Sequence, residues 1–206
     1  CALPISLLER LRFLAIFSSN LDEFYMVRVA SVKAKVERGI TSHNSAGLSP
    51  QELLNAITER AQNLVTRQVD LFHNSIIPQL KEYGIEFISM KELSKSEEEH
   101  LNDYYRKRIY PVLTPLVVDP SHPFPYISGL SLNIGINIES SRDHDISFAR
   151  VKIPTNLPRF IRTSEDSRNR FILIDELIAE NLSELFPGVK IKDHFFFRVK
   201  IGRAHV

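Results

Sequence analysis

The stretch SSNLDEFYMVRVA, residues 18–30, decides how the first half of the chain folds. Apolar residues recur at helical spacing on both sides of it, whereas polar residues crowd its beginning. If one helix ends here, Asn20 becomes the N-cap of a new helix and Glu23, three residues later, closes a capping box. If the helix continues, Asn20 falls three residues after Phe17 and four before Phe24, on the apolar stripe itself.

The second possibility gives Asn20 a chemical role. An amide on an apolar stripe must find a partner or lose about 1–3 kcal/mol to desolvation. A carboxamide offers a donor and an acceptor, which complement the exocyclic amine and ring nitrogen of an adenine edge. The pattern alone leaves both interpretations open. The neighbouring Asp22 and Glu23 are expected to be surface groups or to pair with Arg12 or Arg28 on adjacent turns.

Two long amphipathic helices are predicted around this stretch. The first runs from Pro4, which suits the first helical position, to about Gly39, which suits a stop. The second begins at the N-cap Ser49, where Glu52 is placed to close a capping box, and it continues to about residue 84. A kink is expected near its end, at Pro78.

A short strand is predicted at residues 85–89, followed by a third helix. Ser94 and Glu97 repeat the capping signature, and Pro111 ends this helix after Tyr110. Because each amphipathic helix buries its stripe only against neighbours, three such helices indicate a helical bundle in the N-terminal half.

The second half of the chain has a different pattern. Period-two alternation and short apolar runs predict strands at residues 132–139, 148–153, 170–174 and 189–199. A helix is predicted between residues 175 and 185. The fold class is therefore α then α+β, with the change of character near residues 108–115.

Composition sets broad limits. The chain has 206 residues, of which 43% are hydrophobic and 25% charged, so a buried core is expected. The formal net charge of +1 is too balanced for strong electrostatic capture of nucleic acid. No run approaches the roughly 18–20 apolar residues of a membrane span, and no signal-peptide pattern is present. The single cysteine, Cys1, excludes an intrachain disulfide framework and a cysteine-based metal cluster.

Familiar catalytic motifs are missing from the sequence. It contains no GxxxxGK, GxGxxG, HExxH or GxSxG pattern, and its seven glycines are scattered. No two histidines stand at metal-ligand spacing, so none is assigned a catalytic role. The segment 143–145, Asp-His-Asp, lies between two predicted strands and is interpreted as a polar turn.

Both ends are interpreted as artificial. The chain begins at Cys1 and enters a helical pattern almost at once, so an upstream segment is expected to be missing. The last six residues, IGRAHV at 201–206, correspond on back-translation to a common sequencing adapter and are interpreted as a non-native tail.

Four blocks resemble the N-terminal part of the bacterial polyphosphate kinase family, the type that phosphorylates its own histidine. They are NLDEFYMVRV (20–29), YPVLTPLVVDPSHPFPYISGLSLNIGI (110–136), IPTNLPRFI (153–161) and FILIDELIAENLSELFPG (171–188). They occur in family order and with family spacing, from about residue 3 to residue 199. The family's usual first helix, with its LSWLxFNxRVL pattern, is absent.

The resemblance implies an architecture and an activity. Residues 1–107 would be the all-helical N-terminal domain, and residues 108–200 part of an α+β head domain that makes dimer contacts. Such enzymes reversibly move the terminal phosphate of ATP to inorganic polyphosphate, with Mg²⁺ and a phosphohistidine intermediate. ATP, ADP and polyphosphate are thus the implied partners, together with a second copy of the chain; nucleic acid is not expected. A cytoplasmic location is implied, and peripheral association with the inner membrane is left open.

The resemblance also implies residue roles. In the family, the asparagine directly before LDEF contacts the nucleotide base, and that position is Asn20. The catalytic histidine and the groups that hold phosphate and Mg²⁺ belong to C-terminal domains outside this sequence. No histidine here inherits the catalytic role, and this chain alone is predicted to be inactive.

Two other functions are weighed. A non-catalytic helical scaffold that binds partner proteins fits the missing motifs but leaves Asn20 unexplained. A basic helix for RNA or polyanions is suggested by Arg28, Lys33, Lys35 and Arg38, although such cations usually form a solvated face.

Overall fold

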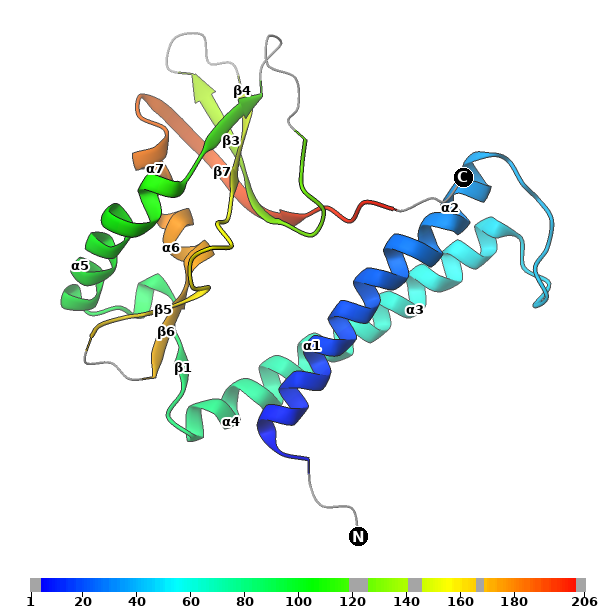
Figure 1. Cartoon of the computed structure of the whole chain (residues 1–206), viewed down its shortest axis with the longest axis horizontal. Helices are drawn as coiled ribbons and strands as arrows, with labels where there is room; N and C mark the ends of the chain where they lie inside the picture. Colours follow the sequence, from blue (N-terminus) through cyan, green and yellow to red (C-terminus); the bar gives the residue numbers. More distant parts are fainter. Residues whose placement is uncertain (1–4, 119–125, 141–145, 166–168, 203–206) are drawn as a thin grey trace. The chain divides into compact units, whose positions relative to one another are not determined.

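The structure, a computed structural model, describes residues 5–118, 126–140, 146–165 and 169–202. The chain forms two compact units (Figure 1): Cys1–Gly84 with Lys200–Val206, and Ile85–Val199. We call the first the helical unit and the second the α+β unit. The sequence class, helices followed by α+β, is confirmed.

The helical unit is a pair of long helices (Figure 1). The first is continuous through α1 (Leu7–Phe24), η1 (Tyr25–Val29) and α2 (Ala30–Glu37), and the second through α3 (Pro50–Leu71), η2 (Phe72–Ile76) and α4 (Ile77–Glu82). The two run beside each other, because α2 packs on α3 and α1 on η2. The elements η1 and η2 are π-helical turns, in which an N–H bonds to the carbonyl five residues back.

Capping residues set the ends of these helices. Ser6 accepts a hydrogen bond from the Glu9 N–H and starts α1, whereas Pro4 lies outside the described residues. Gly39, at φ +67°, stops α2 as predicted, since its N–H bonds to the Val36 carbonyl at 2.9 Å in a Schellman turn. The capping box that begins α3 is confirmed.

Two prolines, Pro78 and Pro111, are each directly preceded by a π turn. The Ile77 N–H bonds to the Phe72 carbonyl directly before Pro78, and the Tyr110 N–H bonds to the Tyr105 carbonyl directly before Pro111. A proline lacks an N–H, and its ring strikes the carbonyl four residues back. The π turn shifts the hydrogen bonds by one residue and so relieves that conflict.

The α+β unit contains two sheets. A three-stranded sheet has the order β1-β6-β5, and a four-stranded antiparallel sheet has the order β2-β4-β3-β7. Their strands are β1 (Glu86–Phe87), β2 (Pro115–Val118), β3 (Leu132–Ser140), β4 (Ile146–Lys152), β5 (Phe160–Arg162), β6 (Arg170–Leu173) and β7 (Val189–Arg198). The helical elements are η3 (Met90–Glu92), α5 (Lys95–Tyr104), η4 (Tyr105–Ile109), η5 (Tyr110–Val112), α6 (Ile174–Glu180) and α7 (Leu182–Leu185).

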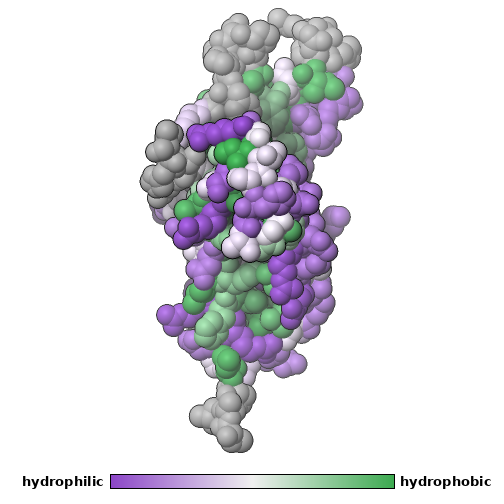
Figure 2. Space-filling model, turned by 90° about the vertical axis from the view of Figure 1, so that its right-hand side faces the viewer, coloured by the Kyte–Doolittle hydropathy of each residue, from purple (hydrophilic) through white to green (hydrophobic). Residues whose placement is uncertain are grey.

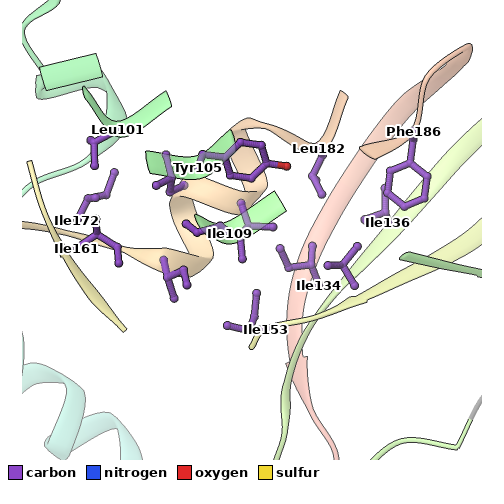
Figure 3. Packing of buried hydrophobic residues seen from close by; sticks show 14 of the residues in the cluster. Leu101, Tyr105, Ile109, Ile134, Ile136, Ile153, Ile161, Ile172, Leu182 and Phe186 are labelled. Atoms are coloured by element: carbon purple, nitrogen blue, oxygen red, sulfur yellow. The ribbon is translucent and has the colours of Figure 1, made fainter. Parts of the chain in front are cut away.

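The core of this unit joins the sheets to α5, η4 and α6. Figure 3 shows Leu101, Tyr105 and Ile109 pointing toward isoleucines of the strands, among them Ile134 and Ile136. All five side chains are fully buried. The helix at 95–109 is therefore a core element of the α+β unit and not the third member of an N-terminal bundle.

The boundary between the compact units consequently differs from the predicted one. The structure divides the chain between Gly84 and Ile85, whereas the sequence pattern suggested a division between residues 107 and 108. The physical reason is that an amphipathic stripe shows that a helix has a partner, but not which partner it has.

Candidate nucleotide-binding face

The helix continues through residues 18–30. Asn20 lies inside α1, and the Tyr25 N–H bonds to the carbonyls of Leu21 and Asp22, so no new helix starts here. The interpretation of Asn20 as an N-cap is therefore wrong. The only irregularity is the π turn η1, where the Ala30 N–H bonds to the Tyr25 carbonyl.

One face of α1 is bound to the second long helix. The Arg10 guanidinium donates to Ser75 Oγ at 2.8 Å and to Gln79 Oε1 at 3.2 Å. One turn further on, Gln68 Nε2 donates to the Leu14 carbonyl at 2.8 Å and to Ser18 Oγ at 2.6 Å. Positions 10, 14 and 18, spaced by four residues, thus define the inner face of α1.

Asn20 lies outside this inner face, about a third of a turn around the helix, on a face that we call the outer face. Helical geometry places it four residues after Ile16 and four before Phe24, in line with Phe13. These three apolar side chains are 44%, 38% and 57% exposed, respectively. Asn20 is exposed as well, and among the described residues its amide has no hydrogen-bond partner. We call Phe13, Ile16, Phe17, Asn20 and Phe24 the outer stripe; it presents one carboxamide among apolar side chains.

A hollow adjoins the outer stripe. It has a volume of about 690 Å³ and lies between α1 and the second long helix, with Phe13, Phe17, Arg67 and Asn74 in its lining. Ligand pockets commonly have volumes of roughly 300–1,000 Å³ and are mostly apolar with few polar groups. Figure 2 shows apolar surface among hydrophilic side chains on this side of the molecule. The volume of the hollow falls in this range, and Asn20 lies beside the hollow rather than among its lining residues.

Asp22, near Asn20, has a partner other than the predicted arginines. Asp22 Oδ1 is 2.9 Å from Lys200 Nζ, whose ammonium also lies 5.1 Å from the ring centre of Tyr25. Arg12 pairs instead with Glu9 at 3.5 Å. The pairing of Asp22 with Lys200 joins residues far apart in the sequence, which i, i+4 reasoning cannot find. Glu23 is exposed, as expected.

The structure does not strengthen the other functional sites considered from the sequence. Arg28, Lys33, Lys35 and Arg38 are all exposed, as in a solvated helix face. In the described part of the chain, no group of three or more His, Cys, Asp or Glu side chains could hold a metal ion. Residues 143–145 lie outside the described residues. Among the described helices, none has both the length and the apolar character needed to cross a membrane.

Sequence reasoning missed a buried ionic network in the α+β unit. Glu97, recognised only as a capping residue, accepts hydrogen bonds from Thr163 Oγ1 at 2.8 Å and from Arg170 Nη1 at 2.5 Å. Burial disfavours its charged form, but the hydrogen bonds from Ser94 and Thr163 and the nearby Arg170 charge outweigh burial. Together they lower the pKa of Glu97 to about 2. Only the tertiary contact with β6 distinguishes this glutamate from its neighbours.

It also missed Arg150 of β4, which is only 5% exposed. Alternation along the strand places Arg150 on the face opposite Ala149 and Val151, where a cation is ordinarily solvated. Burial lowers the pKa of Arg150 below its usual value. Nothing in the local sequence distinguishes a buried arginine from an exposed one.

Comparisons with known proteins agree along the whole chain. A family model for the polyphosphate kinase N-terminal domain matches residues 4–88, and one for the polyphosphate kinase middle domain matches residues 96–200. A polyphosphate kinase of Mycobacterium marinum is 45% identical over 201 residues, and one of Streptomyces coelicolor is 46% identical over 193 residues. Each alignment covers 94% of this chain, but only 27% and 26% of the two relatives.

A solved structure supports the same relationship. The crystal structure of polyphosphate kinase from Porphyromonas gingivalis matches with a TM-score of 0.79 and 27% sequence identity. The match covers 96% of this chain and 29% of that one. The chain therefore spans little more than a quarter of the length of the relatives it matches, in their N-terminal and middle domains.

Proposed function

Because this chain belongs to the polyphosphate kinase family, we propose that it is the nucleotide-side portion of an enzyme that moves the terminal phosphate of ATP to inorganic polyphosphate, and back. In this proposal the helical unit contacts the base of ATP or ADP, and the α+β unit contributes to contacts between copies of the chain. The chemical step and the phosphohistidine belong to domains beyond the matched region.

The observation that carries the proposal is the amide of Asn20. It is exposed on an uninterrupted helix, with apolar side chains one turn before and one turn after it. Its donor and acceptor are both available, because among the described residues neither has a partner. An adenine laid on the outer stripe would gain apolar contact from the neighbouring rings and paired hydrogen bonds from the amide.

The chain by itself is expected to be inactive. Phosphoryl transfer depends on positioning and on stabilising charge around the phosphates. The described residues do not fit the Mg²⁺ that the reaction requires, since they contain no cluster of metal ligands. We therefore assign no catalytic step to this chain and place metal binding in the remaining domains.

Contacts between copies are assigned to the α+β unit. β7 is an edge strand of the four-stranded sheet, and its Phe195 is 47% exposed, with its ring centre 6.3 Å from that of Phe148. Exposed apolar side chains on an edge strand are a feature of association surfaces. Light scattering of the complete enzyme, with and without Phe195→Ser, tests this assignment; an unchanged mass would contradict it.

The experiment that tests the nucleotide site compares Asn20→Ala with Asn63→Ala in the complete enzyme. Asn63 is an exposed mid-helix asparagine of α3, so both variants make the same chemical change in the same kind of helix. Asn20→Ala should raise KM for ATP by about tenfold, the effect of losing about 1.4 kcal/mol of hydrogen bonding. Asn63→Ala should leave KM unchanged.

Stability separates a binding role from a structural one. Alanine has the higher helix propensity, so both variants should raise the free energy of unfolding by about 0.5 kcal/mol. A capping asparagine would instead cost about 1 kcal/mol when replaced. Unaltered KM in a normally folded Asn20→Ala enzyme would remove Asn20 from the nucleotide site.

A further inference from the structure

The outer face of the four-stranded sheet contains a cation, Arg150, that is buried without a counter-charge among the described residues. Along β4, Ala149 and Val151 enter the core, so Arg150 and Lys152 lie on the other face. The Arg150 side chain is nevertheless almost completely covered, at 5% exposure. A buried cation is costly unless it is paired or bound to a ligand.

The partners of Arg150 in the structure are both neutral. Its Nε donates to Asn133 Oδ1 at 2.8 Å, and its Nη1 donates to the Tyr126 carbonyl at 3.3 Å. The Asn133 amide is fixed with its oxygen toward Arg150, because its Nδ2 donates to the Ser131 carbonyl at 2.8 Å. No carboxylate among the described residues forms an ion pair with Arg150. A guanidinium has five N–H donors, so most of them have no acceptor among these residues.

A second cation lies beside Arg150 in a depression of about 420 Å³. Lys152 is two residues further along the same strand face, and its Nζ donates to Ser128 Oγ at 3.3 Å. The lining also carries Thr114, Thr155 and Asn156, and none of its described residues is acidic. Since a water molecule occupies about 30 Å³ of liquid, the depression is large enough for a much larger ion.

We propose that this depression is a subsite for phosphate groups of an inorganic phosphate chain. The free N–H groups of Arg150 form the planar fork that binds phosphate oxygens in pairs, and Lys152 adds a point charge about 7 Å along the strand. The hydroxyl and amide groups of the rim supply neutral donors. The inference of an anion site rests on the buried guanidinium of Arg150. The choice of a phosphate chain over a single phosphate as its ligand rests on the proposed function.

The test is a titration of the 206-residue chain with sodium tripolyphosphate, and separately with orthophosphate and hexaglutamate, followed by NMR of ¹⁵N-labelled arginine side chains. Tripolyphosphate should shift the Arg150 Nε–H signal in a saturable manner, and its Kd should be at least about tenfold below that of orthophosphate, as for one additional charged contact. Equal affinity for orthophosphate, or tighter binding of hexaglutamate, would overturn the assignment to a phosphate chain.

Variants link the binding to these residues. Lys152→Gln removes an exposed cation, and it should weaken tripolyphosphate binding about threefold to fivefold. The matched control is Lys190→Gln, on β7 opposite Glu139 and thus toward the far end of β3 from Asn133. Equal effects of these two variants would indicate diffuse attraction and overturn the site.

Arg150→Gln should weaken tripolyphosphate binding more than tenfold. If this variant fails to fold, the Arg150 signal and the comparison of Lys152 with Lys190 still decide the proposal. A failure here is distinct from failure of the proposed nucleotide site, because the probe carries no base and the KM effect of Asn20→Ala is measured separately.

Discussion

The two units bury their apolar residues to very different extents. In the α+β unit Ile134, Ile136 and Leu177 have no exposed surface and belong to one continuous core. In the helical unit α1 has no buried residue along its described length, and Phe13 is more exposed than covered. The α+β unit is thus stabilised by its core, whereas the helical unit depends more on caps and helix propensity, and its outer stripe is available for a ligand.

The largest expected effect tests the core of the α+β unit. Leu177→Ala removes a fully buried side chain that joins α6 to the sheets and should lower the free energy of unfolding by about 2–5 kcal/mol. Denaturant unfolding, combined with hydrogen exchange to locate the loss, measures this value. A loss below about 1 kcal/mol, or one confined to residues 7–82, would contradict a continuous core.

The buried network of Glu97 should contribute the next largest amount. Glu97→Gln removes the carboxylate that accepts from Thr163 and Arg170, although Arg170 keeps its ion pair with Glu86, and should cost about 1–3 kcal/mol at neutral pH. Glu98→Gln, on the exposed side of the same helix, is the control. Thermal unfolding of both variants gives the comparison, and equal losses would show that the network contributes nothing.

The same network predicts how stability depends on pH. The pKa of Glu97 is about 2 in the folded chain and about 4.3 in an unfolded one, so the unfolded chain takes up the proton first. This contribution is fully present above pH 4.3 and is lost as the pH falls toward 2. When the free energy of unfolding is measured as a function of pH, Glu97→Gln should reduce its slope between about pH 2 and pH 4.3. An unchanged slope would show that other carboxylates cause the pH dependence.

A smaller effect is expected at the start of α3. Ser49→Ala removes the hydroxyl of a capping box that satisfies the Glu52 N–H, at a cost of about 1 kcal/mol. The control, Ser42→Ala, changes an exposed loop serine. Hydrogen exchange in residues 50–71 should accelerate for the first variant alone, whereas equal exchange in both would show that the cap is not needed.

The smallest effect is expected on the outer stripe. Phe13→Ala removes a ring that is 57% exposed, so the free energy of unfolding of this chain should change by no more than about 0.5 kcal/mol. Chemical denaturation measures the change. A loss above about 2 kcal/mol would mean that Phe13 is a core residue and that the two units do not differ in the way described.

Local signals in the sequence were sufficient for most elements. Ser49 and Ser94 begin helices with the predicted capping boxes, and alternation placed β3 and β4 within two residues of their observed ends. The π turns before Pro78 and Pro111 were not predicted, because they are compromises between proline and a helix held by its packing. Asn20 was identified, but its exposure on the outer face was not.

The sequence by itself determined where helices and strands begin and which side chains share a face, since caps and periodicity act within a few residues along the chain. Only the tertiary structure decided that the helix at 95–109 belongs to the sheets, that Lys200 pairs with Asp22, and that Arg150 is covered. These outcomes depend on contacts between residues distant in sequence, whose choice of partner no local pattern records.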